Sequence, residues 1–264
     1  MSVSVRHALR LVAIEMWLPA LLLGAWWFLS RNSKSFFFPP LSQILTRFRE
    51  DWFFARVGSD VVPSLTNLFS ALAIASFVGI AVGVILGLMP TAESILRPVS
   101  AFFRALPGAA LLPLAVIVIG LGSRMCIPLI AFVTVWPILL NTTDGVKGIE
   151  PMVHDVRRSF RINPLLALWK IILPAASPQI VVGLRQALSR GLVLLIFSEL
   201  VGTTSGIGYF TLNAQRNLDV ADMWSGTLLL AVLGYFFNLV FRLFEQRVLG
   251  WHHLRLQVIN GGKS

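Results

Sequence analysis

The sequence contains few charged residues for its length. Only 13% of its 264 residues are Asp, Glu, Lys or Arg, whereas 56% are hydrophobic, and a soluble domain has about 25% charged residues. The mean hydropathy is +0.78. This composition excludes an ordinary soluble domain and indicates an integral membrane protein.

Residues that carry chemistry are also scarce. The single cysteine, Cys126, excludes an internal disulfide and a multi-cysteine metal site. All four histidines lie outside the apolar runs, which leaves none for a membrane-buried hydrolase or a zinc site. The chain has no Gly-x-x-x-x-Gly-Lys-Ser/Thr loop, so it cannot hold ATP phosphates by that route. The sequence therefore predicts no catalytic residue, no metal ligand and no cofactor bound by this chain.

Basic residues outnumber acidic ones, and the net charge is +10. In a soluble protein this excess would indicate nucleic acid as a partner. In a membrane protein it is better explained by basic cytoplasmic loops and by anionic lipid headgroups next to them. We therefore expect membrane lipid, and no nucleic acid, as a partner.

The apolar runs predict an all-α polytopic membrane protein with about six transmembrane helices, since about 20 residues are needed for one crossing. The first run has no small-residue cleavage site after it, so we interpret it as an uncleaved span. The third run is short, which requires its helix to begin earlier and to bend at Pro107-Gly108. Pro128 and Pro137 are expected to break the fourth. The predicted spans are residues 11–29, a helix that includes 109–121, and residues 68–89, 127–140, 174–201 and 223–241.

Two further patterns occur in the first part of the chain. In residues 30–62, apolar side chains recur at helical spacing after Pro39-Pro40, which predicts an amphipathic helix on the outer surface.

In the second span, Gly79, Gly83 and Gly87 form a small-residue ridge that lets two helices approach closely. We expect this ridge to pack within the chain, with a homodimer contact as the alternative.

Residues 152–178 are the only long interruption of the apolar pattern, and they are too charged to insert. Four basic residues at the bilayer centre would oppose insertion by about 10 kcal/mol or more. Helical spacing of the apolar residues predicts two short amphipathic helices here. Asn163 is suited to the N-cap of the second helix and Pro164 to its first position. The charges are those of Asp155, Arg157, Arg158, Arg161 and Lys170.

This segment resembles the coupling loop, or EAA loop, of permease subunits of bacterial ABC importers. The family pattern is Glu-Ala-Ala, three residues, Gly, nine residues and Ile-x-Leu-Pro. Its end is matched in full by Ile171, Leu173 and Pro174, whereas Asp155 stands at the Glu and Arg161 at the Gly. Because Arg does not adopt positive φ cheaply, we expect the turn to differ in detail. The wider resemblance covers residues 63–251 and is nearest to the nitrate/sulfonate/taurine branch.

The resemblance implies a type I ABC importer permease fold in the inner membrane. Its coupling loop, residues 150–174, would bind a dimer of cytoplasmic ATPase subunits that hold ATP and Mg²⁺. A solute-binding protein would deliver the solute to two permease copies, either identical or paralogous. The residues assigned to the coupling loop are Asp155, Arg157, Arg158, Arg161, Asn163, Pro164, Trp169, Leu173 and Pro174.

The branch implies a small oxyanion such as a sulfonate, taurine or nitrate, with an aromatic acid or a pyrimidine precursor as the alternative. Two alternative functions from other classes are a secondary transporter and a membrane scaffold, each without an ATPase. No inverted repeat of the kind that many secondary transporters have is visible.

The charged residues of the fifth span are candidates for the translocation path, because ionisable residues within a membrane usually face a bundle interior or a water-filled cavity. Arg185 and Glu199 are 14 residues apart, close to four helical turns, and should share a face. Arg185 either pairs with a carbonyl or carboxylate or contacts the solute. Arg190 is a candidate for neutralising an oxyanion. Glu199 is expected to brace an outer gate loop, residues 203–209, with Gly206 and Gly208.

We divide the chain into a first span with its external amphipathic segment (1–62), a permease core (63–251) and a basic cytoplasmic tail (252–264). A cytoplasmic coupling loop and six spans would place both termini in the cytoplasm. Most basic residues agree with this orientation, but those of residues 30–62 do not.

Overall fold

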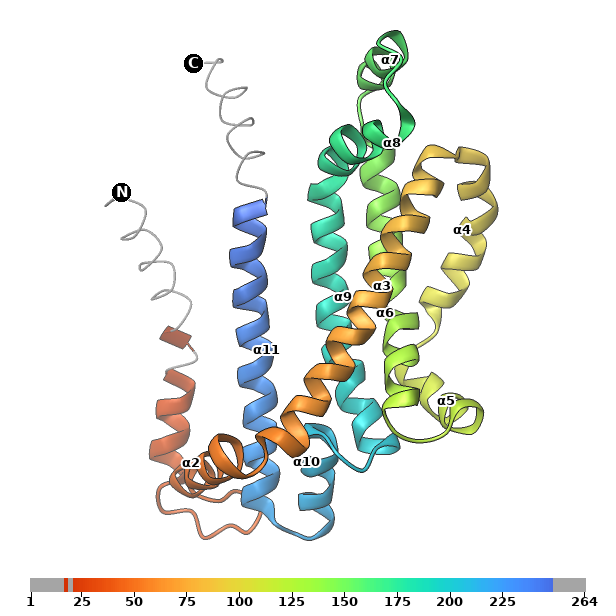
Figure 1. The fold of residues 1–264 in the computed structure, drawn as a ribbon. Helices are drawn as coiled ribbons and strands as arrows, with labels where there is room; N and C mark the ends of the chain where they lie inside the picture. The colour runs from red at the N-terminus through yellow and green to blue at the C-terminus, as the bar shows by residue number, and fades with distance from the viewer. Residues whose placement is uncertain (1–16, 19–20, 249–264) are drawn as a thin grey trace, which may run out of the picture. The chain divides into compact units, whose positions relative to one another are not determined.

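The computed structural model describes residues 17–18 and 21–248, which form helices and connecting turns without a strand among them (Figure 1). They belong to two compact units. The first comprises the described residues up to 58 together with 210–230, and the second comprises residues 59–209 together with 231–248. The helices are α2 (Leu41–Glu50), η1 (Asp51–Ala55), η2 (Val57–Val61), α3 (Val62–Leu88), α4 (Pro90–Ala105), η3 (Gly108–Leu111), α5 (Leu112–Ile119), α6 (Ser123–Lys147), α7 (Pro151–Ser159), α8 (Pro164–Ala167), η4 (Leu168–Ile172), α9 (Leu173–Gly202), α10 (Ile207–Arg216) and α11 (Val220–Val248).

Within the described residues, four helices are long and apolar enough to cross a membrane, or five if the bent pair α4 and η3–α5 forms one span. They correspond to the predicted second to sixth spans. The predicted first span, residues 11–29, lies partly outside the described residues. Its described part includes most of a shorter apolar helix, Leu21–Ser30. The basic tail, residues 252–264, lies outside the described residues.

The predicted bend in the third span is confirmed. Helix α4 ends at Ala105, and η3 begins at Gly108 at an angle of 86° to it. Pro107 explains the break, because its ring excludes the helical conformation of Leu106, which is extended (φ −73°, ψ 123°).

The expectation that Pro128 and Pro137 break the fourth span is wrong. Helix α6 is continuous from Ser123 to Lys147 and contains both prolines. Each proline removes one backbone hydrogen bond, yet buried contacts with α3 and α9 hold the helix together. The carbonyl of Pro137 itself accepts a hydrogen bond from Asn141 Nδ2 at 2.7 Å.

The glycine ridge of α3 lies against α6 within the chain. A Cβ atom added to Gly79 would come within 2.9 Å of Ile138 Cβ, and one added to Gly87 within 2.5 Å of Val146 Cβ. The two backbones therefore approach more closely than any side chain would permit. Helix α6 also packs on α9, so that α3, α6 and α9 form the centre of the second unit.

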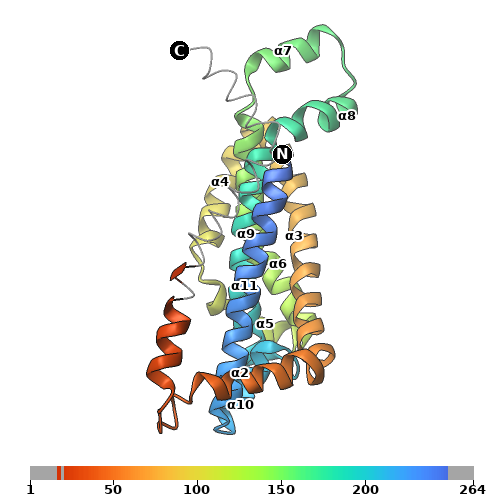
Figure 2. The same cartoon turned by 90° about the vertical axis from the view of Figure 1, so that its left-hand side faces the viewer.

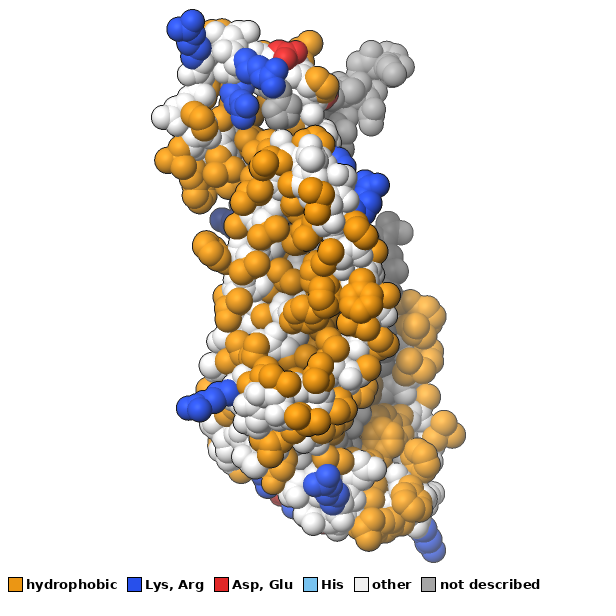
Figure 3. Space-filling view, turned by 90° about the vertical axis from the view of Figure 1, so that its right-hand side faces the viewer, with side chains coloured by type: hydrophobic (Ala, Val, Ile, Leu, Met, Phe, Trp, Pro, Cys, Tyr) orange, Lys and Arg blue, Asp and Glu red, His pale blue; other side chains and the backbone are white. Residues whose placement is uncertain are grey.

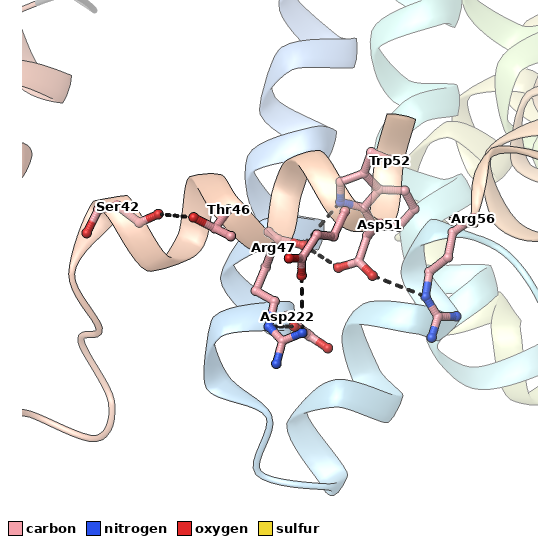
Figure 4. Close-up of polar contacts among 9 residues, drawn as sticks. Ser42, Thr46, Arg47, Asp51, Trp52, Arg56 and Asp222 are labelled. Carbon is pink, nitrogen blue, oxygen red and sulfur yellow. Dashed lines mark hydrogen bonds and ion pairs between the residues drawn. The ribbon is translucent and has the colours of Figure 1, made fainter. Parts of the chain in front are cut away.

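In the first unit, α2 and η1 are joined to the start of α11 by a polar network (Figure 4). Trp52 Nε1 donates to Ser225 Oγ at 3.1 Å, and Arg47 pairs with Asp222 at 3.4 Å. Asp51 pairs with Arg56 at 3.5 Å. Two of the basic residues that disagreed with the expected orientation are thus partly neutralised by neighbouring carboxylates.

Candidate functional site

Helices α7 and α8 form an elbow at one end of the second unit (Figures 1 and 2). Pro151 begins α7 directly after the extended residue Glu150. Asn163 is the N-cap of α8, and its Oδ1 accepts a hydrogen bond from the N–H of Leu165 at 2.9 Å. Pro164 occupies the first helical position, where its missing N–H has no partner to lose. The predicted pair of short helices and the predicted cap are confirmed.

The turn between these helices contains one residue in the left-handed conformation that glycine adopts most easily. Arg161 stands at the glycine position and has φ of +48°. Arg161 thus adopts positive φ, a conformation that costs free energy for any residue with a Cβ, and the expected difference in the detail of the turn stays a prediction. The hydrogen bonds from the N–H groups of Phe160 and Ile162 to Val156 and Arg157 hold the turn closed, and they offset the steric cost of a Cβ in this region.

The elbow exposes large apolar side chains, which we call the coupling surface. Phe160 is 77% exposed and Trp169 is 64% exposed. By contrast, Ile172, which the spacing placed on the same stripe as Trp169, is buried against α6 and α9. Exposed apolar residues rimmed by charged ones are typical of a protein interface. The coupling surface consists of Met152, Val156, Phe160, Leu165, Leu166 and Trp169.

Charged side chains surround this surface. Asp155, Arg158, Arg161 and Lys170 are all exposed, and Arg157 is half-buried. Figure 3 shows basic and hydrophobic side chains side by side at the end of the molecule formed by α7 and α8. The elbow therefore offers both apolar area and positive charge to a partner.

The elbow is joined to α9 without a connecting loop. Helix α8 continues into the π-helical segment η4, which continues into α9 at Leu173. Pro174 explains the change in geometry, because it has no N–H for the carbonyl of the residue four positions earlier. Figure 2 shows α8 lying across the end of α9.

In α9, Arg185 and Glu199 are engaged within the chain. Arg185 Nη1 lies 3.1 Å from Glu245 Oε2, and its Nη2 donates to Asn238 Oδ1 at 3.3 Å. Glu199 is 1% exposed and accepts a hydrogen bond from the N–H of Gly208 at 2.9 Å. This geometry matches the structural interpretation of Arg185 and the bracing interpretation of Glu199.

Two residues that the sequence did not single out complete the bracing of residues 203–209. Asp60 Oδ1 accepts from the N–H of Gly206 at 3.0 Å, and Ser64 Oγ accepts from the N–H of Ile207 at 3.0 Å. Together with Glu199 they satisfy three successive N–H groups at the start of α10. The positive end of the helix dipole favours acidic side chains there. In the sequence, the feature that could have indicated this bracing role is the i, i+4 spacing of Asp60 and Ser64 before an apolar run.

Arg190 lies on a different face of α9 and lines a cavity of about 830 Å³. Arg104, at the end of α4, and Trp136, in α6, line the same cavity. Neither Arg185 nor Glu199 does. The cavity belongs to a neighbouring face of α9, and the hypothesis that the face of Arg185 and Glu199 lines the translocation path stays a prediction.

These features define a class of protein: a polytopic helical membrane subunit with a charged elbow suited to docking and a cavity between its central helices. Residues 59–250 match the family described as the binding-protein-dependent transport system inner membrane component. The chain belongs to this family, and it is the permease subunit of an ABC importer, a transport subunit of the inner membrane.

Individual relatives agree with this assignment. The chain is 30% identical over 250 residues to the taurine transport system permease protein TauC of Escherichia coli, covering 92% of this chain and 91% of that protein. It is 32% identical over 174 residues to the bicarbonate transport system permease protein CmpB of Synechococcus elongatus, covering 66% and 63%. A chain of the MetNI methionine ABC transporter has the same fold, with a TM-score of 0.60, 20% identity and coverage of 72% and 94%.

Proposed function

We propose that this permease imports a small oxyanion, with ATP hydrolysis supplied by a separate pair of ATPase subunits that bind α7 and α8. ATP and Mg²⁺ would then be held by those subunits and not by this chain. An extracytoplasmic solute-binding protein would deliver the solute, and a second permease copy, identical or paralogous, would complete the pathway. The exposed coupling surface is the observation that carries this proposal.

The coupling surface supports ATPase docking because the described residues of the chain offer it no cover. Six large apolar side chains lie exposed on the elbow, and the charged residues of α7 and of the turn after it oppose entry of that part into the bilayer. A groove in a cytoplasmic ATPase would bury them and pair with the surrounding arginines. The elbow would therefore lie on the cytoplasmic side, and with six spans both termini would lie there too.

The names of the relatives support the solute class. They are permeases for taurine, for aliphatic sulfonates and for bicarbonate, and each of these solutes carries an oxyanion group. Closure of the ATPase pair would move the two elbows, and the spans would change between inward-facing and outward-facing arrangements by rigid-body motion.

Copurification tests the docking of the ATPase. Phe160→Ala and Trp169→Ala should each reduce the amount of ATPase that copurifies with the tagged permease, because each removes a large exposed side chain from the interface. Phe77→Ala is the matched control, since Phe77 is 78% exposed on α3, outside the elbow. Equal recovery of the ATPase with all three variants would contradict the proposal, as would uptake that vanadate leaves unaffected.

Thiol labelling tests the side of the membrane. The native Cys126 is fully buried, so a cysteine introduced as Asn163→Cys supplies the one reactive thiol among the described residues. An impermeant maleimide should label it in inside-out vesicles and not from the exterior of sealed cells. Labelling from the exterior alone would contradict a cytoplasmic elbow.

A further inference from the structure

Two acidic side chains are buried under the loop that joins α9 to α10. Glu199 is 1% exposed and Asp60 is 4% exposed. They accept hydrogen bonds from the N–H groups of Gly208 and Gly206, at 2.9 Å and 3.0 Å, and the charge of Asp60 acts on Glu199. Two carboxylates that share a buried site repel each other when both are ionised, which favours the protonated form of one of them.

The hydrogen bonds around the two carboxyl groups show which of them is short of a donor. Both oxygens of Asp60 accept, Oδ1 from the N–H of Gly206 and Oδ2 from Ser59 Oγ at 2.8 Å. In Glu199, Oε2 accepts from the N–H of Gly208, whereas Oε1 is buried and has no hydrogen-bond partner among the described residues. Asp60 is therefore surrounded as a carboxylate is, and Glu199 is not.

The protonated form of Glu199 explains this arrangement. An ionised carboxylate spreads its charge over both oxygens, and leaving one of them without a donor and away from water is costly. A carboxylic acid instead carries its proton on one oxygen and accepts with the other. The surroundings of Glu199 fit a proton on Oε1 and an acceptor at Oε2.

The neighbours of Glu199 supply no formal positive charge that would stabilise its ionised form. The titratable side chains whose charge acts on it are Asp60, in η2, and Cys126, in α6, and both are acids. Ser64, in α3, is a neutral neighbour. The start of α10 favours a negative charge, but the negative end of the α9 dipole, which lies three residues after Glu199 at Gly202, opposes it.

A metal cation fits this position less well than a proton does. The described residues contain no group of three His, Cys, Asp or Glu side chains that could hold a metal ion. The backbone of Gly206 also covers the carboxyl group closely, since a Cβ atom added to Gly206 would lie 2.7 Å from both oxygens of Glu199. A proton needs no space of its own.

We propose that the loop of residues 203–209 is a proton-linked gate, in which closing the loop over Glu199 takes up one proton on Oε1 and opening it returns that proton to water. An O–H bond forms on closing and breaks on opening, and no other covalent bond changes. When the loop lifts, water reaches both oxygens, and Glu199 ionises as a solvated carboxylic acid does. The proton uptake is argued from the buried pair alone, whereas the role of the loop in gating a solute rests on the import function proposed above.

Infrared spectroscopy of the full-length chain in lipid nanodiscs tests where the proton lies. A protonated carboxyl group has a C=O stretching band separate from the bands of a carboxylate. This band should be present in the unmodified chain at pH 7 and lost in Glu199→Gln. Glu50→Gln is the matched control, because it makes the same change in an exposed side chain of α2, and it should keep the band.

Hydrogen exchange tests the link between the proton and the loop. The closed loop binds one proton more than the open loop, so a rise in pH favours opening. Over the pH range in which Glu199 is ionised only when the loop is open, the protection of the amides of residues 206–208, corrected for intrinsic exchange, should fall about tenfold per pH unit. In Glu199→Gln this protection should not change with pH, and Glu50→Gln should follow the unmodified chain.

Three results would overturn the proposal. The first is a carboxyl band that Glu199→Gln leaves unchanged. The second is a band that is kept in Glu199→Gln and lost in Asp60→Asn, which would place the proton on Asp60. The third is protection of residues 206–208 that does not change with pH in the unmodified chain, a result that needs no variant to fold. None of these measurements involves an ATPase or a solute, so the import function can stand if the proton site fails.

Discussion

The carboxylate of Glu199 accepts a hydrogen bond from the N–H of Gly208 at 2.9 Å, where the chain turns from α9 into α10. Gly206, two residues earlier, has φ of +115°, and a Cβ there would lie 2.5 Å from the Glu199 Cδ atom. The loop of residues 203–209 is therefore closed tightly over a buried acidic side chain, which favours a single conformation.

Substitution of Glu199 should separate the hydrogen bond from the charge. Glu199→Ala leaves the N–H of Gly208 without its acceptor, which should lower the free energy of unfolding by about 1–3 kcal/mol. Glu199→Gln keeps an acceptor oxygen and should remain folded, but it loses the charge at the start of α10 and should change uptake and ATPase rates. Melting in detergent and transport assays in proteoliposomes measure the two effects. Unchanged rates in Glu199→Gln would remove the charge from the gating mechanism.

Substitution of Gly83 should disrupt the contact of α3 with α6. A Cβ at this position would lie 2.6 Å from Thr142 Cβ and 2.7 Å from the carbonyl oxygen of Leu139. Because one of these neighbours is backbone, Gly83→Ala should force the helices apart and destabilise the chain by about 1–3 kcal/mol. Thermal melting in detergent measures this.

Gly234→Ala is the control for that experiment, because a Cβ at Gly234, in α11, meets no atom within 4 Å. It should leave the melting temperature unchanged or raise it slightly, since alanine is the better helix former. Equal melting temperatures for Gly83→Ala and the unmodified chain would show that α3 and α6 can move apart without loss of stability.

Substitution of Arg161 by glycine should stabilise the elbow. Arg161 has φ of +48°, a conformation that glycine adopts without a Cβ clash, and the gain should be about 1 kcal/mol. Hydrogen exchange of the amides in residues 151–172 should slow by about fivefold. Arg161→Ala removes the guanidinium but keeps the Cβ, so it should show no such protection; equal slowing in both variants would assign the effect to the charge instead.

The pairing of Arg185 with Glu245 should appear as a coupling energy between α9 and α11. Their side chains are 40% and 26% exposed, so solvent screening limits the coupling to about 1 kcal/mol. A double-mutant cycle of Arg185→Gln and Glu245→Gln, followed by thermal melting, measures it. Strict additivity of the two single effects would mean that the pair contributes nothing.

Local patterns were sufficient to predict much of this fold. The second to sixth spans, the bend after Ala105 and the Asn163 cap each depend on residues close together in the chain. Tertiary contacts and hydrogen bonds decided what these patterns could not predict. Contacts with α3 and α9 keep α6 continuous through its prolines, and the hydrogen bonds of the elbow hold Arg161 at positive φ.

The candidate sites could be predicted only in part, because they combine residues far apart in sequence. Asp60 and Gly206 are separated by 146 positions, and Arg185 and Glu245 by 60. Periodicity states which face of one helix a residue occupies, but not which helix lies opposite. Arg190 was therefore recognised as a candidate without the two partners, Arg104 and Trp136, that share its cavity.

The loop-free join between α8 and α9 has a mechanical consequence. Because η4 continues the helical backbone to Leu173, no flexible loop separates the elbow from α9. A displacement of the elbow would therefore not be absorbed between them. The displacement must reach α9 as a tilt or a rotation, and α9 carries Arg190 on its cavity face. A movement of the elbow would thus change the orientation of Arg190, about 25 Å along α9 from Leu173.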